Sequence, residues 1–152
     1  MRERLFFDDV QIGDAVESIA RTISETDIWM FAYITADFFP LHTDVEFAEK
    51  TIFGGPIAQG MLILSIALGM IDQVILSKYD VSSVVAFHGI RNVRFLRPVR
   101  VGDTIRAKAE VVDKKERDEK SGIVTYHLTV LNQRDEAVLA AEYSALIMKS
   151  PS

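Results

Sequence analysis

One apolar segment near the middle of the chain constrains the fold more than any other feature of the sequence. Residues 57–71 are apolar apart from Gln59 and Ser65, and the segment ends at Asp72. A membrane-spanning helix needs about 20 apolar residues. This stretch is shorter and interrupted, so we expect no membrane span. A helix that is apolar on nearly every side must instead be covered by protein, which predicts a central helix over residues 57–76.

The second half of the chain has the pattern of a sheet that can supply this cover. Stretches rich in Val, Ile, Thr, Tyr and Phe predict strands over residues 84–97, 104–113, 122–132 and 137–148. Short turns join these strands, so we expect antiparallel neighbours. The simplest arrangement wraps a curved antiparallel sheet around the central helix. This is the hot-dog fold, of class α+β, and its unpaired edge strand predicts a homodimer or an assembly of dimers.

The first third of the chain is predicted to begin with a strand and a helix. Residues 15–23 alternate loosely between apolar and polar side chains, as a strand does. Ser24, followed three positions later by Asp27, resembles a capping box and marks the start of a helix. Apolar residues at helical spacing then extend this helix to about Ala36.

A loop and a second short helix are expected to follow. Pro40 disfavours helical backbone at the residue before it, so residues 37–41 are predicted to be a loop. Thr43 with Glu46 matches a capping box, which predicts a helix that runs to about Lys50.

Size and composition exclude several classes of protein. A chain of 152 residues fits a single domain over residues 1–152, and 49% hydrophobic with 26% charged residues is a globular balance. The net charge of −5 argues against nucleic acid or an anionic membrane as the main partner. The absence of cysteine excludes disulfides, thiolate metal sites and a cysteine nucleophile. With no signal peptide at the N-terminus, we expect a cytoplasmic protein that binds no metal.

The predicted loop carries the residues best suited to chemistry, Asp37 and His42. Histidine exchanges protons near neutral pH, and a partly desolvated aspartate beside it can polarise a water molecule or take a proton. Addition of water across a C=C bond needs this division of labour. In the alternative interpretation, Asp37 only caps the preceding helix and His42 fills a surface turn. The neighbouring Phe38 and Phe39 favour a site with a dry wall.

A glycine in the first turn of the central helix adds a second feature. The first N–H groups of a helix have no internal partner and carry the positive end of its dipole. Gly60 would let a thioester carbonyl approach these groups, as an oxyanion hole requires. The alternative is that Gly60 only permits tight packing of the helix on the sheet. Ser65, farther along, either bonds a backbone carbonyl or contacts substrate.

These two features, in this order, resemble the MaoC-like dehydratases, which include the (R)-specific enoyl-CoA hydratases. The family pattern is a glycine, then D-x-N-P-L-H, then five residues and a small one. Here Asp37, residues 40–42 and Ala48 match this pattern, and Ala36 replaces the glycine. The family segment I-A-H-G-M-L corresponds to residues 57–62, and residues 92–99 with the following Gly-Asp pair also look alike. The resemblance covers roughly residues 7–148.

The resemblance implies an activity and a set of site residues. Asp37 and His42 would be the catalytic pair, and the Gly60 amide would hold the thioester oxygen. The implied reaction is reversible syn hydration of a trans-2-enoyl-CoA to a 3-hydroxyacyl-CoA, within fatty acid metabolism. It needs no metal and no redox cofactor, since coenzyme A is part of the substrate. The substrate pocket would include Phe38, Phe39, Gln59, Met61 and Ser65.

Two residues depart from the family pattern inside the implied site. Phe39 stands where asparagine is usual, so a side chain that forms hydrogen bonds is replaced by one that cannot. Gln59 stands where histidine is common, and it still offers a donor and an acceptor. With Phe39, either packing holds the loop instead or the pocket suits a different acyl group. Neither departure removes the catalytic pair, and with both present the resemblance does not specify the substrate.

A cluster of cationic residues is a candidate site for the phosphates of coenzyme A. Residues 91–108 contain six cationic side chains against one carboxylate, a local net charge of +5. We assign coenzyme A binding to Arg91, Arg94 and Arg97, although strand alternation places Arg94 on the opposite face from the other two. The alternative is a solvated strand face with acidic partners elsewhere.

Two other functions fit the same fold. A hot-dog thioesterase commonly has a carboxylate in or near the central helix, and residues 57–71 contain none. A non-catalytic acyl-CoA-binding subunit would not need both Asp37 and His42, whereas Phe39 leaves that function open. His88 and His127 are expected to be structural.

Overall fold

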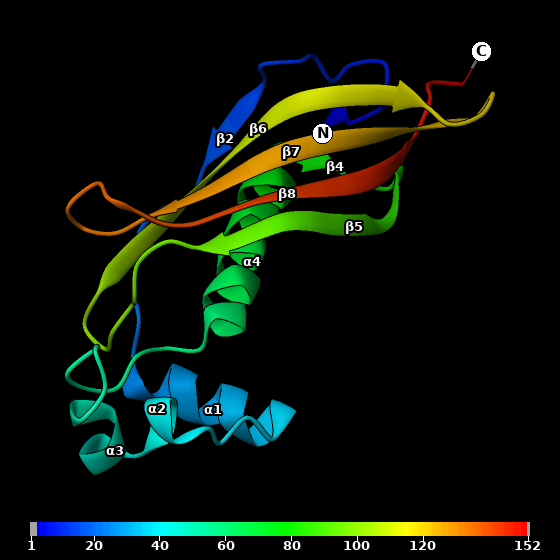
Figure 1. The fold of residues 1–152 in the computed structure, drawn as a ribbon. Helices are drawn as coiled ribbons and strands as arrows, with labels where there is room; N and C mark the ends of the chain where they lie inside the picture. The colour runs from blue at the N-terminus through cyan, green and yellow to red at the C-terminus, as the bar shows by residue number, and fades with distance from the viewer. Residues whose placement is uncertain (1–2, 152) are drawn as a thin grey trace.

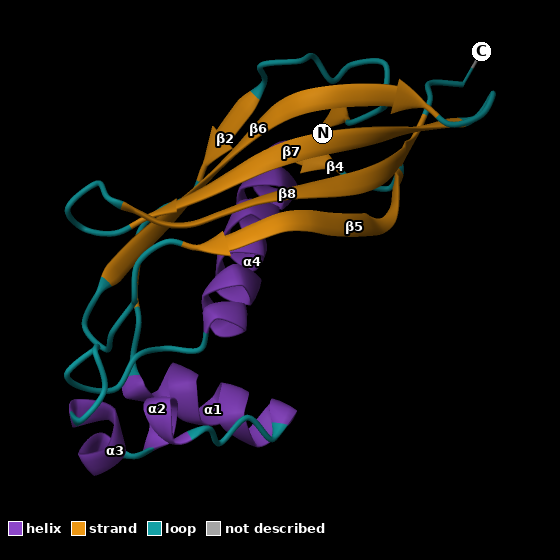
Figure 2. Cartoon of the chain, viewed as in Figure 1, coloured by secondary structure: helices purple, strands orange, loops and turns teal. Residues whose placement is uncertain are grey.

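A curved antiparallel sheet forms one layer of the molecule in the computed structural model, which describes residues 3–151 (Figures 1 and 2). Its main strands run in the order β2-β6-β7-β8-β5, and β3 also pairs with β6. The strands of this sheet are β2 (Ala15–Glu17), β3 (Arg21–Thr22), β5 (Val84–Phe95), β6 (Thr104–Glu116), β7 (Ser121–Leu131) and β8 (Ala137–Met148). A separate parallel pair joins β1 (Glu3–Arg4) to β4 (Tyr79–Asp80).

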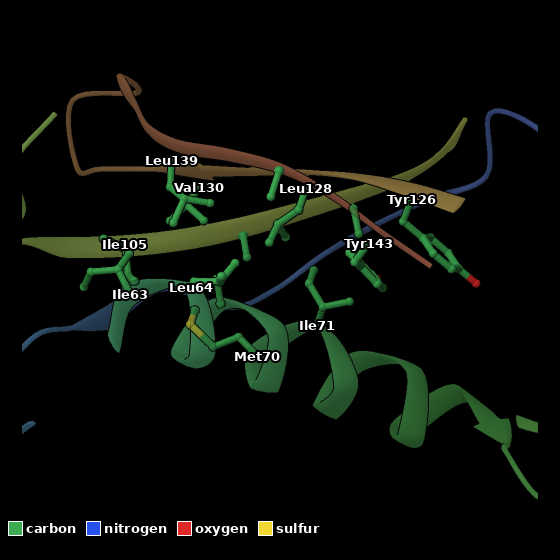
Figure 3. Packing of buried hydrophobic residues seen from close by; sticks show 14 of the residues in the cluster. Ile63, Leu64, Met70, Ile71, Ile105, Tyr126, Leu128, Val130, Leu139 and Tyr143 are labelled. Carbon is green, nitrogen blue, oxygen red and sulfur yellow. The ribbon is translucent and has the colours of Figure 1, made fainter. Parts of the chain in front are cut away.

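The long helix α4 (Gly60–Lys78) packs against one face of this sheet. Side chains alternate along a strand, so Tyr126 and Leu128 of β7 point toward the helix, whereas His127 between them is exposed (Figure 3). Ile71 of α4 is fully buried beneath them. A sheet curved over one apolar helix is the predicted hot-dog arrangement, and that prediction is confirmed.

The start and the exposure of α4 differ from the prediction. The helix begins at Gly60 rather than residue 57, because the backbone of Gln59 is extended, with a ψ of 132°. The Ile57 and Ala58 amides, which precede the helix, donate to the carbonyls of Leu41 and Val99. Only one side of α4 is covered within a single chain, and Met61 on the other side is 53% exposed. Length and composition alone would also let α4 cross a membrane. Its buried face accounts for part of this apolar sequence.

Helix α1 (Glu25–Thr35) begins at the predicted capping box. The Asp27 amide donates to the Ser24 hydroxyl at 3.2 Å, and the Ser24 amide donates to the Asp27 carboxylate at 2.8 Å. The helix ends at Ala36, whose φ of 60° is left-handed. Figure 1 shows α1, α2 and α3 gathered beyond the first turn of α4.

One local prediction in the first third of the chain is confirmed in part, and two are wrong. The strand expected over residues 15–23 is interrupted between β2 and β3. Pro40 starts the helix α2 (Pro40–Thr43) instead of lying in a loop, because proline is well tolerated at the first helical position. Helix α3 (Val45–Glu49) is capped by Asp44, whose carboxylate accepts from the Phe47 amide at 3.0 Å. Thr43 does not cap this helix, since its hydroxyl donates to carbonyls in the preceding segment.

Candidate active site

A cavity of about 360 Å³ lies where the start of α4 meets α2 and the adjoining ends of β5 and β8. Among the residues predicted to form the site, it is lined by Asp37, His42, Gln59, Gly60, Met61 and Arg97. Apolar side chains complete much of the wall, including Phe53, Ile63, Phe95 and Leu139. The fold thus brings two titratable groups and a helix N-terminus around one mostly apolar space.

His42 is oriented by a backbone carbonyl. Its Nδ1 lies 2.7 Å from the Ile57 carbonyl oxygen, which can only accept a hydrogen bond. Nδ1 therefore carries a proton and donates it, and Nε2 is the ring nitrogen available for proton exchange. The Ile57 amide donates in turn to the Leu41 carbonyl at 3.3 Å, so the two segments hold each other.

Asp37 is half-buried at the first position after the C-cap of α1. Its Oδ1 accepts a long hydrogen bond of 3.4 Å from the Phe39 amide, and its own amide donates to the Thr35 hydroxyl. The Oδ2 atom has no hydrogen-bond partner among residues 3–151. Asp37 therefore braces its own turn and still presents a carboxylate oxygen for another contact.

The turn that aims Asp37 depends on the left-handed backbone of Ala36. A side chain with a Cβ atom disfavours this conformation by about 1–2 kcal/mol, and glycine adopts it freely. The family pattern has glycine at this position, and the φ of 60° gives the physical reason. Ala36 keeps the same turn at the expense of local strain.

Gly60 is the first residue of α4, and no side chain caps this end of the helix. A Cβ atom added at Gly60 would lie 2.6 Å from Cε1 of Phe95, closer than such atoms can approach. Unless the Phe95 ring moves, packing against β5 therefore requires glycine here. The first-turn amides also lack intrahelical partners, so the geometry is compatible with both interpretations of Gly60.

Arg100 holds the segment that leads into α4, a role that the sequence did not reveal. Its guanidinium donates to the Pro56 carbonyl at 3.2 Å and to the Phe53 carbonyl. Its partners are more than forty residues away in sequence, so no local pattern could identify them. Arg100 belongs to the predicted cationic cluster, yet it binds backbone rather than an external anion.

Three residues assigned to the pocket do not line this cavity. Phe38 packs against Tyr33, with ring centroids 5.4 Å apart. Phe39 lies edge-on to the His42 ring, at 6.1 Å, and is not part of the cavity lining. Ser65 donates to the Met61 carbonyl at 2.8 Å, which is the backbone contact that the sequence allowed.

The three candidate arginines are distributed differently from the prediction. Arg91 pairs with Glu142 and Arg94 with Ala140, two β8 residues on the face that points away from α4. An irregularity between Arg91 and Arg94, with Asn92 at a φ of 54°, puts both arginines on the same face. The predicted separation of Arg91 from Arg94 is wrong for this reason, and only Arg97 reaches the cavity.

The two remaining histidines, as far as the cavity lining shows, lie outside the site. His88 and His127 are exposed. In the part of the chain that the structure describes, no group of three or more His, Asp or Glu side chains is placed to hold a metal ion.

Residues 9–132 of this chain match the family model of the MaoC like domain. The (R)-specific enoyl-CoA hydratase of Rhodospirillum rubrum is 34% identical over 106 residues, which cover 70% of this chain and 69% of that protein. Protein MaoC of Klebsiella aerogenes is 35% identical over 105 residues. These residues cover 69% of this chain but only 30% of Protein MaoC.

Among the solved structures that match this chain over almost its whole length, one has a high sequence identity. It is the X-ray structure of a monoamine oxidase regulatory protein from Archaeoglobus fulgius, with 71% sequence identity and a TM-score of 0.97. The match covers 99% of this chain and 98% of that one.

Proposed function

We propose, because this chain belongs to the MaoC-like domain family, that it catalyses reversible hydration of a trans-2-enoyl-CoA. In this reaction water adds its hydroxyl to C3 of the acyl group and a proton to C2, and dehydration is the reverse. The observation that carries the proposal is the shared cavity of Asp37, His42 and Gly60. The relatives named as (R)-specific enoyl-CoA hydratase and 3-hydroxybutyryl-CoA dehydratase support the same class of substrate.

Asp37 and His42 would carry the two proton transfers. The hydrogen bond from Nδ1 to the Ile57 carbonyl leaves Nε2 of His42 available to the reaction. The free Oδ2 of Asp37 offers a second proton-exchanging atom. One group activates the water and the other serves C2, and such positioned groups contribute about 10²–10⁴-fold to rate.

The start of α4 would stabilise the thioester oxygen. Negative charge develops on that oxygen when C2 gains or loses its proton, and uncapped helix amides can bind it. Gly60 has no side chain to block this approach. The apolar wall around it lowers the local dielectric and strengthens the interaction.

A homodimer would complete the site. Strand β5 is at the edge of the sheet, and its Phe87, Ile90 and Phe95 are between 40% and 55% exposed. Met61 on the uncovered side of α4 is similarly exposed. A second copy paired at this edge would satisfy the unpaired backbone groups and cover these side chains. Two further predictions are that Arg97 binds coenzyme A and that the protein is cytoplasmic.

Thioester hydrolysis is less well supported by the same geometry. The only carboxylate of α4 is Asp72, twelve residues from Gly60, which is about 18 Å along a helix. It lines a different cavity. A carboxylate at that distance cannot reach a carbonyl bound at the first turn.

The deciding experiment is an assay of the purified protein with crotonyl-CoA and with branched and dicarboxylic enoyl-CoAs. We expect loss of the enoyl-thioester absorbance without release of free coenzyme A. Release of free coenzyme A would favour a thioesterase. Tight binding with no turnover of any substrate would favour a non-catalytic or regulatory protein and would reject the hydratase.

A further inference from the structure

Gln59 places an unsatisfied acceptor in the wall of the candidate active site. The residue is only 2% exposed and lines the same cavity as Asp37 and His42. Its Nε2 donates to the Ile28 carbonyl at 3.2 Å, whereas its Oε1 is buried and has no partner within the described chain. Buried polar atoms almost always have a partner, so this oxygen calls for a donor from outside the chain.

The orientation of the amide follows from its neighbour. A backbone carbonyl only accepts hydrogen bonds, so the Ile28 oxygen requires the amide nitrogen to face it. The opposite rotamer would place two acceptors together. The amide group is therefore fixed with Oε1 as its free atom, and a group that binds Oε1 must donate a hydrogen bond.

The position of Gln59 in the chain indicates which donor this is. It directly precedes Gly60, whose amide is proposed to hold the thioester oxygen. It follows Ile57, whose carbonyl orients His42, by two residues. In the proposed function, the Gly60 amide holds the oxygen on C1 and His42 serves the reacting carbons, so the acyl segment between them would run from C1 to C3. The O–H that joins or leaves C3 is the donor that the reaction itself supplies there.

We infer that Oε1 of Gln59 accepts a hydrogen bond from the oxygen that adds at C3. This oxygen belongs to the attacking water in hydration and to the 3-hydroxyl group in dehydration. The inference rests on the proposed hydratase function. It makes Gln59 a specificity-determining residue, since acyl-CoAs with a 3-hydroxyl are bound more tightly than those without one. The family pattern has an amide side chain at position 39, and this chain has Phe39 there. The Gln59 side chain would supply an amide to the site from a different position.

The test compares two ligands that differ by one hydroxyl group. The hydroxyacyl ligand is 3-hydroxybutanoyl-CoA, whose Michaelis constant is measured in the dehydration direction. The ligand without the hydroxyl is butanoyl-CoA, whose inhibition constant is measured against crotonyl-CoA hydration. For Gln59→Met we expect the first constant to rise about tenfold, the effect of one neutral hydrogen bond. The inhibition constant of butanoyl-CoA should stay within about twofold, because it has no hydroxyl to lose that contact.

Further variants separate this role from a structural one. Gln59→His keeps an acceptor and should retain the preference for the hydroxyacyl ligand. Gln73→Met, the same change at an exposed position of α4 that lines neither the cavity of Asp37 nor that of Asp72, is the matched control. Thermal unfolding checks each fold, and Gln59→Leu replaces the Met variant if that one unfolds.

Two results would overturn the inference while leaving the proposed function intact. One is an active Gln59→Met enzyme whose Michaelis constant for the hydroxyacyl ligand is unchanged. The other is an equal loss of affinity for both ligands, which would assign Gln59 to the coenzyme A portion or to packing. A wild-type protein that hydrates no enoyl-CoA would instead reject the proposed function, and this inference with it.

Discussion

The two ends of α4 border cavities of similar size, about 360 Å³ near Gly60 and about 300 Å³ around Asp72, but their polar groups are held differently. At the Gly60 end, His42 is anchored to a backbone carbonyl. At the Asp72 end, Tyr143 stacks on Tyr126 at 4.9 Å, and its buried hydroxyl has no partner within residues 3–151.

Desolvation favours the neutral forms of the groups at the Asp72 end, where Tyr126 and Tyr143 are buried and Asp72 is still partly exposed. Desolvation raises the pKa of the Asp72 carboxyl. Burial raises the pKa of Tyr126 to about 12 and raises that of Tyr143 as well. We therefore assign proton transfer to the Gly60 end and not to this one. The Gly60 end differs because hydrogen bonds fix which atom is available to a substrate.

The largest effect is expected when the titratable groups are replaced separately at each end of α4. We expect Asp37→Asn and His42→Ala each to lower kcat for enoyl-CoA hydration at least about 100-fold. Asp72→Asn should leave kcat within about twofold, because Asp72 lies about 18 Å away along the helix. Circular dichroism checks that all three variants fold. Near-normal turnover by either of the first two would refute the proposed mechanism.

A second test asks what Gly60 contributes. Gly60→Ala places a Cβ atom against Phe95, so we expect a loss of about 1–3 kcal/mol in the free energy of unfolding, as in other overpacked sites. Phe95→Ala in the same chain should relieve the clash. If hydration returns to the rate of the Phe95→Ala single variant, Gly60 serves packing alone. If hydration stays low in a stable double variant, close approach to the helix amides is required.

How well the sequence predicted each region depended on the range of the contacts involved. The capping box at Ser24, the strands and the apolar helix arise from neighbours within a few residues, and local patterns identify them. The Arg100 contacts with Phe53 and Pro56, and the fit of Gly60 against Phe95, join distant segments. No local pattern contains them.

The candidate site shows the same division. Motif resemblance predicted Asp37, His42 and Gly60 as a group, and the structure brings all three to one cavity. Phe38 and Phe39 were assigned to the pocket because they are adjacent in sequence, yet adjacent side chains point in different directions. The irregularity in β5 at Asn92 reverses the alternation that separated Arg91 from Arg94. A single bulge of this kind cannot be located from composition.

The backbone strain next to Asp37 offers a smaller test. Ala36→Gly removes a left-handed penalty of about 1–2 kcal/mol but adds about 0.5–1 kcal/mol of backbone entropy to the unfolded state. We therefore expect a net gain of up to about 1.5 kcal/mol in the free energy of unfolding, measured by chemical denaturation. Ala36→Val should destabilise the protein and lower kcat, since a β-branched side chain resists this backbone and would displace Asp37. Equal stability of the Gly and Val variants would contradict the assigned backbone conformation.

The smallest expected effect concerns Asp72 and serves to sharpen the contrast between the two ends. Its pKa is raised in the folded protein by desolvation, so the folded state holds its proton to higher pH than the unfolded chain does. Stability therefore falls as the pH rises through this range, and the penalty is absent below the unfolded pKa of about 3.8. Asp72→Asn should be slightly more stable than wild type at pH 7, by no more than about 0.5 kcal/mol, because solvent screens a side chain that is partly exposed. This gain should vanish in acid.

Glu25→Gln, at an exposed position in α1, controls for the loss of a charge. A gain that persists unchanged in acid would mean that Asp72 is not strained by burial, and that the two ends of α4 differ less than their contacts indicate.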